Sequence, residues 1–253
     1  MKPFLRYALF TAVIGVTLIF AQKQPQPKSQ KEVDAIQAMF QAQDPDSRIK
    51  AAEALIVKFA DTEFKALALY LIAASYEQKG DVEKMIVYAE ETLKADPKDY
   101  KPMFMLAAGF AKRTREFDLD KEEKLGKAEK YAKEGIEAVK VAAKPNPSVT
   151  DEQWTAAKKD FEAQAHDALG QVAMVRKKYD VATQEFTTAL TTAGNPDPVT
   201  YIRLAQAHTM SGKPDDALAA LDKLNAIADL HPQIKQAAQA ERVRATQAKN
   251  TKK

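Results

Sequence analysis

Histidine and cysteine, the residues that most often carry nucleophilic, redox or metal chemistry, are scarce in this sequence of 253 residues. The absence of Cys excludes disulfide scaffolds, thiol nucleophiles, thiolate zinc sites and iron–sulfur clusters. With only three His (His166, His208 and His231), a multi-histidine metal site is nearly excluded as well. The sequence also lacks GxGxxG, Walker, GxSxG, HExxH and EF-hand motifs. We therefore predict no catalytic, cofactor-binding or metal-binding residues.

A few other residues could carry chemistry or recognition, and each has a plainer interpretation. His166 and His208 occur where large core residues recur, so we expect packed rings with one nitrogen hydrogen-bonded; a functional role is the alternative. Asp215-Asp216 is predicted to cap a helix and complement its dipole rather than bind metal. Trp154, the single Trp, is predicted to be a core anchor, with an exposed interaction hot spot as the alternative.

Charge is nearly balanced along the chain. There are 38 Lys and Arg against 35 Asp and Glu, a formal charge of +3, and this balance predicts no nucleic-acid partner. The stretch 112–140 holds 9 basic and 8 acidic side chains. We interpret it as a solvated helix with pairs such as Glu123–Lys127 and Glu129–Lys133, and a docking role of the turn within it as the alternative.

The composition favours helices as the elements that position these residues. The chain has 45 Ala but only 8 Gly and 12 Pro, so it is rich in helix formers and poor in breakers. Hydrophobic residues make up 45% of the sequence, enough for a substantial core.

The first 21 residues have the organisation of a targeting segment. Lys2 and Arg6 precede an uncharged apolar run from Tyr7 to Ala21, which is short for a membrane span. We predict a signal peptide cleaved after Ala21, with an uncleaved N-terminal membrane anchor as the alternative. Removing two basic residues lowers the net charge from +3 to +1. We expect a bacterial protein that is periplasmic or secreted, or else held in the inner membrane facing the periplasm, with a flexible linker at 22–30.

The remaining sequence repeats a pattern with a period near 34. One copy has Leu69, Ile72, Ala73 and Tyr76, followed by Gly80-Asp81, Met85, Ala89 and Pro97. The spacing recurs at four other places, whose first-helix positions include Ile36 and Met39; Met103 and Leu106; His166 and Leu169; Tyr201 and Leu204. Several copies in register are much stronger evidence than one.

This pattern resembles the tetratricopeptide repeat family over residues 31–228. The resemblance implies an all-α fold, a right-handed superhelical solenoid of antiparallel helix pairs, with five repeats. We expect a polar capping helix at 229–248 and a disordered tail at 249–253.

The array departs from its period in the middle. The small position of the second helix falls at Ala52, Met85, Ala128, Ala182 and Ala217, with separations of 33, 43, 54 and 35. Insertions are therefore predicted near 112–127 and 142–161. Thr150 and Gln153 form a capping-box pattern that opens a helix early. We predict a long first helix of repeat four, from Asp151 to Arg176.

In the tetratricopeptide family, the first helices line a concave groove that binds partners. The resemblance places these groove residues at Tyr70, Ala74, Glu77, Gln78, Lys101, Phe104, Ala108, Lys112, Gln164, Asp167, Gln171, Met174, Ile202, Gln206 and Met210. The Lys/Asn clamp that some members use for a terminal carboxylate is absent, because Tyr70 and Ala74 stand at its positions in one repeat. The implied groove is mixed and partly apolar.

The resulting hypothesis is a non-catalytic protein–protein interaction scaffold of the bacterial cell envelope, without a cofactor. Its partner would be a protein or peptide, held as a helix or an extended segment. One alternative is a membrane-anchored structural component of an envelope assembly complex. A more distant alternative is a small-ligand binder or enzyme with a closed polar pocket around His166 and Asp167.

Overall fold

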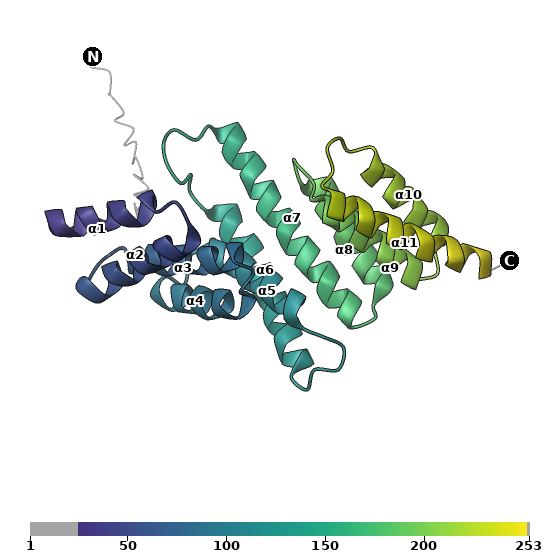
Figure 1. Ribbon diagram of the computed structural model, residues 1–253, viewed down its shortest axis with the longest axis horizontal. Coiled ribbons are helices and arrows are strands. Elements are labelled where there is room, and N and C mark those ends of the chain that lie inside the picture. Colours follow the sequence, from purple (N-terminus) through teal and green to yellow (C-terminus); the bar gives the residue numbers. More distant parts are fainter. Residues whose placement is uncertain (1–24, 252–253) are drawn as a thin grey trace, which may run out of the picture.

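The computed structural model describes residues 25–251, and these residues form eleven helices and no strand (Figure 1). The predicted signal peptide and its cleavage point lie outside the described residues. The helices are α1 (Gln30–Gln41), α2 (Pro45–Lys58), α3 (Lys65–Gln78), α4 (Val82–Ala95), α5 (Tyr100–Arg113), α6 (Lys121–Val141), α7 (Asp151–Val175), α8 (Tyr179–Thr192), α9 (Pro198–Met210), α10 (Pro214–Asn225) and α11 (Pro232–Thr251).

Local sequence explains where many of these helices begin. Asp44 and Asp81 cap α2 and α4, because each carboxylate accepts a hydrogen bond from a backbone N–H of the first turn. Four helices (α2, α9, α10 and α11) begin at Pro, whose missing N–H is not needed in the first turn. Asp215-Asp216 lies in the first turn of α10, as the dipole argument predicts. However, neither side chain caps this helix, because the N-cap residue is Lys213 and makes no side-chain cap.

The helices form five consecutive pairs and a final single helix, as the repeat pattern predicts. Each helix packs against the next, and α11 packs on α9 and α10, so the chain is an all-helical solenoid. Small residues mark the close approaches: Ala73, Ala107 and Ala205 are fully buried. At Gly170 an added Cβ would lie 2.5 Å from the ring of Phe186, so only glycine fits there. The predicted small positions are therefore confirmed as packing positions.

The long helix predicted in repeat four is confirmed as α7, with 25 residues. Its capping box is formed, since Thr150 and Gln153 bond each other's backbone N–H groups. Trp154 is 8% exposed and donates from its indole nitrogen to the carbonyl of Ala142 at 3.1 Å, so it is the predicted core anchor. The added length lets α7 pack against α5 and α6 as well as α8 (Figure 1).

The insertion near 112–127 mostly lengthens α6 to 21 residues. The loop before it, 114–120, carries two outward hydrophobic side chains, Phe117 and Leu119. The predicted pair Glu123–Lys127 is present at 3.2 Å. Glu129, which we expected to pair with Lys133, instead pairs at 2.8 Å with Arg176, the residue directly after α7, because α7 lies beside α6.

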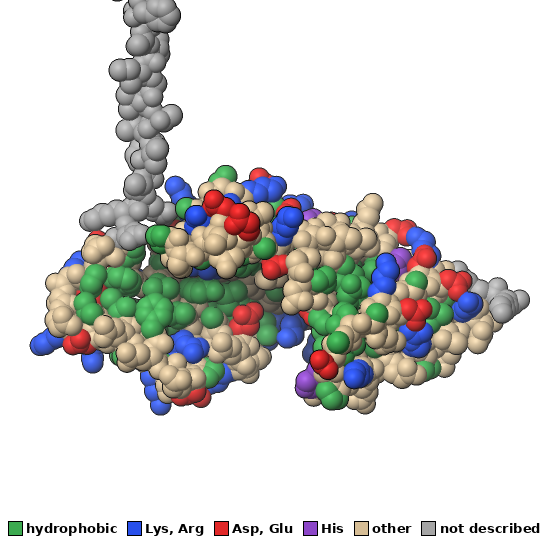
Figure 2. All heavy atoms as spheres, turned by 90° about the horizontal axis from the view of Figure 1, so that it is seen from above, with side chains coloured by type: hydrophobic (Ala, Val, Ile, Leu, Met, Phe, Trp, Pro, Cys, Tyr) green, Lys and Arg blue, Asp and Glu red, His purple; other side chains and the backbone are tan. Residues whose placement is uncertain are grey.

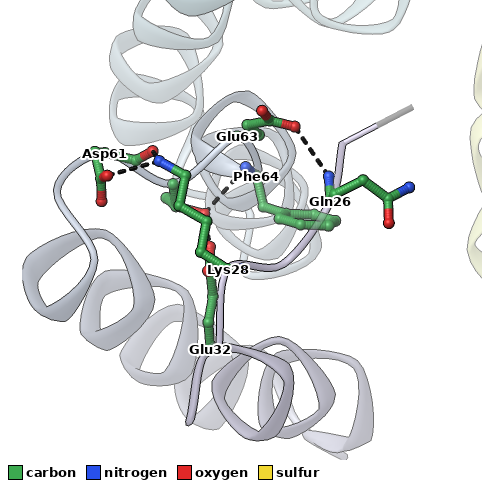
Figure 3. A network of polar contacts seen from close by, with 7 residues as sticks. Gln26, Lys28, Glu32, Asp61, Glu63 and Phe64 are labelled. Carbon is green, nitrogen blue, oxygen red and sulfur yellow. Dashed lines mark hydrogen bonds and ion pairs between the residues drawn. The ribbon is translucent and has the colours of Figure 1, made fainter. Parts of the chain in front are cut away.

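The expected flexible linker is wrong for the part that the structure describes. The backbone N–H of Gln26 donates to Glu63 at 2.9 Å, and Lys28 Nζ contacts Asp61 Oδ2 at 2.6 Å (Figure 3). Glu32, 1% exposed, accepts hydrogen bonds from the Lys28 backbone and the Thr62 hydroxyl, both at 2.6 Å. These contacts hold residues 26–32 against the loop between α2 and α3.

The C-terminal end also differs from expectation, because α11 continues to Thr251 rather than ending at Ala248. Glu241, in the middle of α11, is 2% exposed. It accepts a hydrogen bond from the Thr209 hydroxyl of α9 at 2.8 Å and pairs with Arg244 at 3.2 Å. The first and last helices are therefore each held by one buried glutamate bonded to a threonine. None of the helices within 25–251 is long and apolar enough to cross a membrane.

Candidate partner-binding surface

The fifteen predicted groove residues lie on the first helices of four pairs, α3, α5, α7 and α9, and differ widely in exposure. The exposed ones are Glu77, Gln78, Lys112, Gln164 and Met210. The half-buried ones are Tyr70, Ala74, Lys101, Ala108, Asp167, Gln171, Met174 and Gln206. The buried ones are Phe104 and Ile202. Position in the repeat alone therefore does not decide which side chains a partner could reach.

Phe104, predicted to line the groove, is a core residue and only 4% exposed. Its ring stacks on Phe161 of α7, with centroids 5.3 Å apart, and lies against Gly135 of α6. Tyr100 meets Phe161 edge to face at 5.1 Å in the same cluster. Phe161 belongs to the lengthened part of α7. Its ring therefore covers Phe104, which would otherwise face the predicted groove. Ile202 is likewise buried, at 6% exposure, in the C-terminal core.

The α3–α5 part of the surface combines aromatic rings with charges. Lys101 Nζ lies 4.7 Å from the ring centre of Tyr70 and 3.5 Å from Asp99. Burial, with the nearby Asp99 and Glu77 charges, raises the pKa of Tyr70. Burial also raises the pKa of Tyr100, to about 12, and raises the pKa of Asp99 although Lys101 opposes this. This part of the surface is therefore a poorly solvated, largely apolar environment.

Figure 2 shows how hydrophobic and charged side chains are distributed over one face of the molecule. On the side of α1–α4, hydrophobic side chains gather along a hollow. On the side of α8–α11, hydrophobic patches alternate with charged side chains. On this face, the two halves of the solenoid thus present different side chains.

Between α7 and α9, the predicted residue Asp167 is a structural link as well as a surface group. It accepts hydrogen bonds from the Thr200 hydroxyl at 2.8 Å and the Arg203 guanidinium at 2.7 Å. Gln171, one turn later on α7, donates to it at 2.8 Å. Because these partners lie on α7 and α9, Asp167 fixes how the two helices sit side by side.

A first cavity, of about 320 Å³, lies at the N-terminal end of this α7–α9 surface. Alanine and leucine side chains line it together with three carboxylates, Asp160, Asp167 and Asp197. Two predicted groove residues, Ala108 and Gln164, are also in its wall.

A second cavity, of about 620 Å³, lies at the other end, where α7 and α9 meet α11 and the loop 114–120. Met174, Gln206 and Met210, all predicted groove residues, line it. Met210 is 57% exposed, which is unusual for a hydrophobic side chain of this size. The charged lining residues are Arg115, Glu116, Lys177, Glu241 and Arg244. The structure therefore brings five of the seven α7 and α9 predictions into two cavities. Gln171, Ile202 and the α3 predictions line neither cavity.

The three histidines have different surroundings. His166 Nδ1 lies 2.7 Å from Glu185 of α8, a contact that joins the two helices of the fourth pair. The first cavity includes Asp167 but His166 is not among its lining residues, so the pocket expected by the enzyme alternative is not found there. His208 Nδ1 is buried without a hydrogen-bond partner in the described structure, contrary to our expectation, and burial lowers the pKa of this ring. Within residues 25–251 no group of three acidic or histidine side chains could hold a metal ion.

Several residues of this surface were not found from the sequence. Arg115 and Arg244 flank the second cavity, yet Arg115 lies in a predicted insertion and Arg244 in a predicted cap. Glu32 and Glu241 had no distinguishing pattern, because a charged residue on an amphipathic helix is ordinarily solvent-exposed. Only the contacts of neighbouring helices reveal that both are buried.

Comparison with known proteins supports the fold. No protein-family model and no curated protein matches the chain. Among solved structures it is similar to TTC0263, a thermophilic TPR protein of Thermus thermophilus, with a TM-score of 0.56 and 16% identity. This match covers 83% of the present chain and 98% of TTC0263. The MamA protein is similar with a TM-score of 0.54 and 13% identity, over 79% of this chain and 98% of MamA. The chain therefore has a tetratricopeptide-like solenoid fold.

Proposed function

We propose that the chain is a non-catalytic scaffold that binds a segment of a protein partner along the first helices of its pairs. The observation that carries this proposal is the second cavity, which is lined by half-buried Met174 and exposed Met210, both predicted groove residues. Apolar side chains at the bottom of a concave, charged surface suit an amphipathic helix or an extended segment. Methionine adapts its shape easily to such partners.

Site-specific photo-crosslinking in the producing cell tests this proposal. A photoreactive residue at Gln164 or Gln206, on the first-helix surface, is expected to form adducts with another protein. Lys133 of α6 and Lys223 of α10 are exposed positions on second helices and serve as matched controls. Equal adduct formation at all four positions would contradict binding along the first helices. Phe104 is unsuitable for such tests, because changing a buried residue would disturb the fold.

We also propose that the protein acts in the bacterial cell envelope, in the periplasm or outside the cell. Support comes from the sequence alone, in the basic start and the apolar run from Tyr7 to Ala21. Mass spectrometry of the mature N-terminus tests this part. A chain that begins at Gln22 agrees with export and cleavage, whereas an intact start found in the cytosolic fraction contradicts it.

One structural observation supports the alternative of a membrane-anchored structural component. The contacts of Gln26 and Lys28 with the loop between α2 and α3 attach the beginning of the described chain firmly to the solenoid. An uncleaved anchor would then be joined to the solenoid through an ordered segment rather than a flexible linker. Recovery of the uncleaved chain in the membrane fraction after a high-salt wash would favour this alternative.

A further inference from the structure

The two ends of the α7–α9 surface carry opposite charge. The first cavity is lined by three aspartates and by no Lys or Arg. The second is lined by three cationic side chains and two glutamates. A partner segment that spans both cavities would therefore meet different electrostatic conditions at its two ends.

The existing ion pairs leave a positive charge at the second cavity. Lys177 pairs with Glu116 at 2.5 Å, and Arg244 pairs with Glu241 at 3.2 Å, so both glutamates are already neutralised. Arg115 is exposed, and its guanidinium forms no ion pair within the described part of the chain. Its backbone N–H, and less strongly its charge, help to lower the pKa of nearby Asp118, a carboxylate that already pairs with Lys124 at 3.4 Å. Arg115 lines the same cavity as Met174 and Met210. An apolar pocket thus has an unpaired guanidinium in its lining.

The first cavity has the opposite imbalance. Arg203 neutralises Asp167 at 2.7 Å. Asp160 and Asp197 accept hydrogen bonds only from backbone N–H groups, those of Gly194 and Val199, both at 2.9 Å. Neither carboxylate forms an ion pair among residues 25–251. An acidic side chain placed here would be repelled.

The two cavities are separated by a defined length of helix. Asp167 of α7 contacts Thr200 of α9, and Met174 lies across the second cavity from Met210, so the two helices run in the same direction. From Gln164 to Met174 is ten residues, which corresponds to about 15 Å at the helical rise of 1.5 Å per residue. An extended segment covers this distance in about five residues.

We propose that the α7–α9 surface recognises an acidic amphipathic segment and binds it in a single direction. A large apolar side chain of the partner occupies the pocket of Met174 and Met210, and an acidic residue beside it pairs with Arg115. About five residues away, next to Asp160 and Asp197, the segment has no acidic residue. This inference rests on the proposed function and specifies the chemistry of the partner and its orientation.

Peptide selection provides a direct test. The immobilised full-length chain is used to select from a display library of random peptides about twelve residues long. We expect enrichment of peptides in which Glu or Asp lies within three positions of Leu, Phe or Met, with no acidic residue about five positions away on one side. Enriched peptides without acidic residues, or with basic residues next to the apolar one, would overturn the proposal.

Variants separate this inference from the proposed function. Arg115→Glu and Met210→Glu are each expected to weaken binding of the selected peptides roughly fivefold or more, since both side chains are on the surface and their loss should leave the fold intact. Lys133→Glu, the same type of change on the exposed side of α6, is the control and should leave the affinity unchanged.

Asp160→Lys tests the direction of binding. An acidic residue is added to the selected peptides at the end that would lie beside Asp160. The variant should bind these peptides, whereas the original protein should bind them poorly. If peptides are enriched but none of these variants alters their binding, the inference fails, and crosslinking at Gln164 and Gln206 decides separately whether the segment lies along the first helices. If no peptide is enriched at all, both the inference and the proposed function are contradicted.

Discussion

The N-terminal and C-terminal halves of the solenoid use the same helix-pair architecture for different surfaces. Between α5 and α7, aromatic rings fill the space: Phe104 stacks on Phe161, and Tyr100 closes the cluster. Between α7, α9 and α11, the helices are linked by polar contacts at Asp167 and Glu241, and cavities remain. Aromatic rings close the space between α5 and α7, whereas the polar links between α7, α9 and α11 leave space and charge that can discriminate between partners.

The largest expected effect comes from opening the aromatic cluster. Phe104→Ala should lower the free energy of unfolding by about 4 kcal/mol, because it removes a buried ring and leaves a cavity. Urea denaturation followed by circular dichroism measures this change. Met210→Ala, in the other half, is the matched control and should cost less than about 0.5 kcal/mol. A small effect of Phe104→Ala would mean that the N-terminal half is not filled as described.

A polar link in the C-terminal half should be of intermediate strength. Asp167→Ala should lower the free energy of unfolding by about 2 kcal/mol, since it removes charge-assisted hydrogen bonds and leaves Arg203 unpaired. The double variant Asp167→Ala/Arg203→Ala, measured beside both single variants, gives the coupling energy of the pair. A coupling energy near zero would show that the pair does not hold α7 against α9.

The turns between paired helices allow a smaller test. Gly80 and Gly212 have φ angles of +73° and +74°, and in repeat four Lys177 has a φ angle of +60°. The left-handed conformation costs a residue other than glycine roughly 1 kcal/mol. Lys177→Gly should therefore raise the free energy of unfolding by about 1 kcal/mol, with only a slight offset from its exposed ion pair with Glu116. Gly80→Ala should lower it by a similar amount, and thermal denaturation of both variants should show shifts of opposite sign.

The smallest effect concerns the buried glutamate of the N-terminal half. Hydrogen bonds from the Thr62 hydroxyl and the Lys28 backbone lower the pKa of Glu32. A carboxylate with a lowered pKa stabilises the fold above its unfolded pKa, about 4.3, and this stabilisation is lost as the pH falls through the folded pKa. Glu32→Gln should therefore reduce the loss of stability between pH 7 and pH 3, measured by urea denaturation.

Glu134→Gln, at an exposed position of α6, is the control for this experiment and should retain the pH dependence of the original protein. An unchanged pH dependence in Glu32→Gln would show that the bonds around Glu32 do not stabilise the ionised form.

Much of the fold could be predicted from local sequence. The recurring small and large residues predicted five helix pairs, and Thr150 with Gln153 predicted the start of α7, because helix periodicity and capping depend on residues within a few positions of each other. The ends of the chain were predicted less well. Composition suggested disorder at 22–30, but the contacts seen at Gln26 and Lys28 depend on Asp61 and Glu63, more than thirty residues away.

The binding surface was predictable only in outline. Repeat positions placed the candidate residues on the correct helices, and Met174, Gln206 and Met210 do meet in one cavity. The burial of Phe104 was missed, because it depends on Phe161, which an insertion brings onto α5. The charged lining was missed as well, since Arg115 and Lys177 belong to two separate repeats and Arg244 to the final helix, α11.

The sequence by itself determined the helical class, the number of helix pairs, the long α7 and the lack of recognisable catalytic motifs, since each follows from composition or short-range spacing. Only the tertiary structure decided which groove side chains are buried, where cavities remain and how charge is distributed along α7 and α9. The physical reason is that exposure and ion pairing depend on the distance between side chains from different repeats. That distance is set by the packing of whole helices.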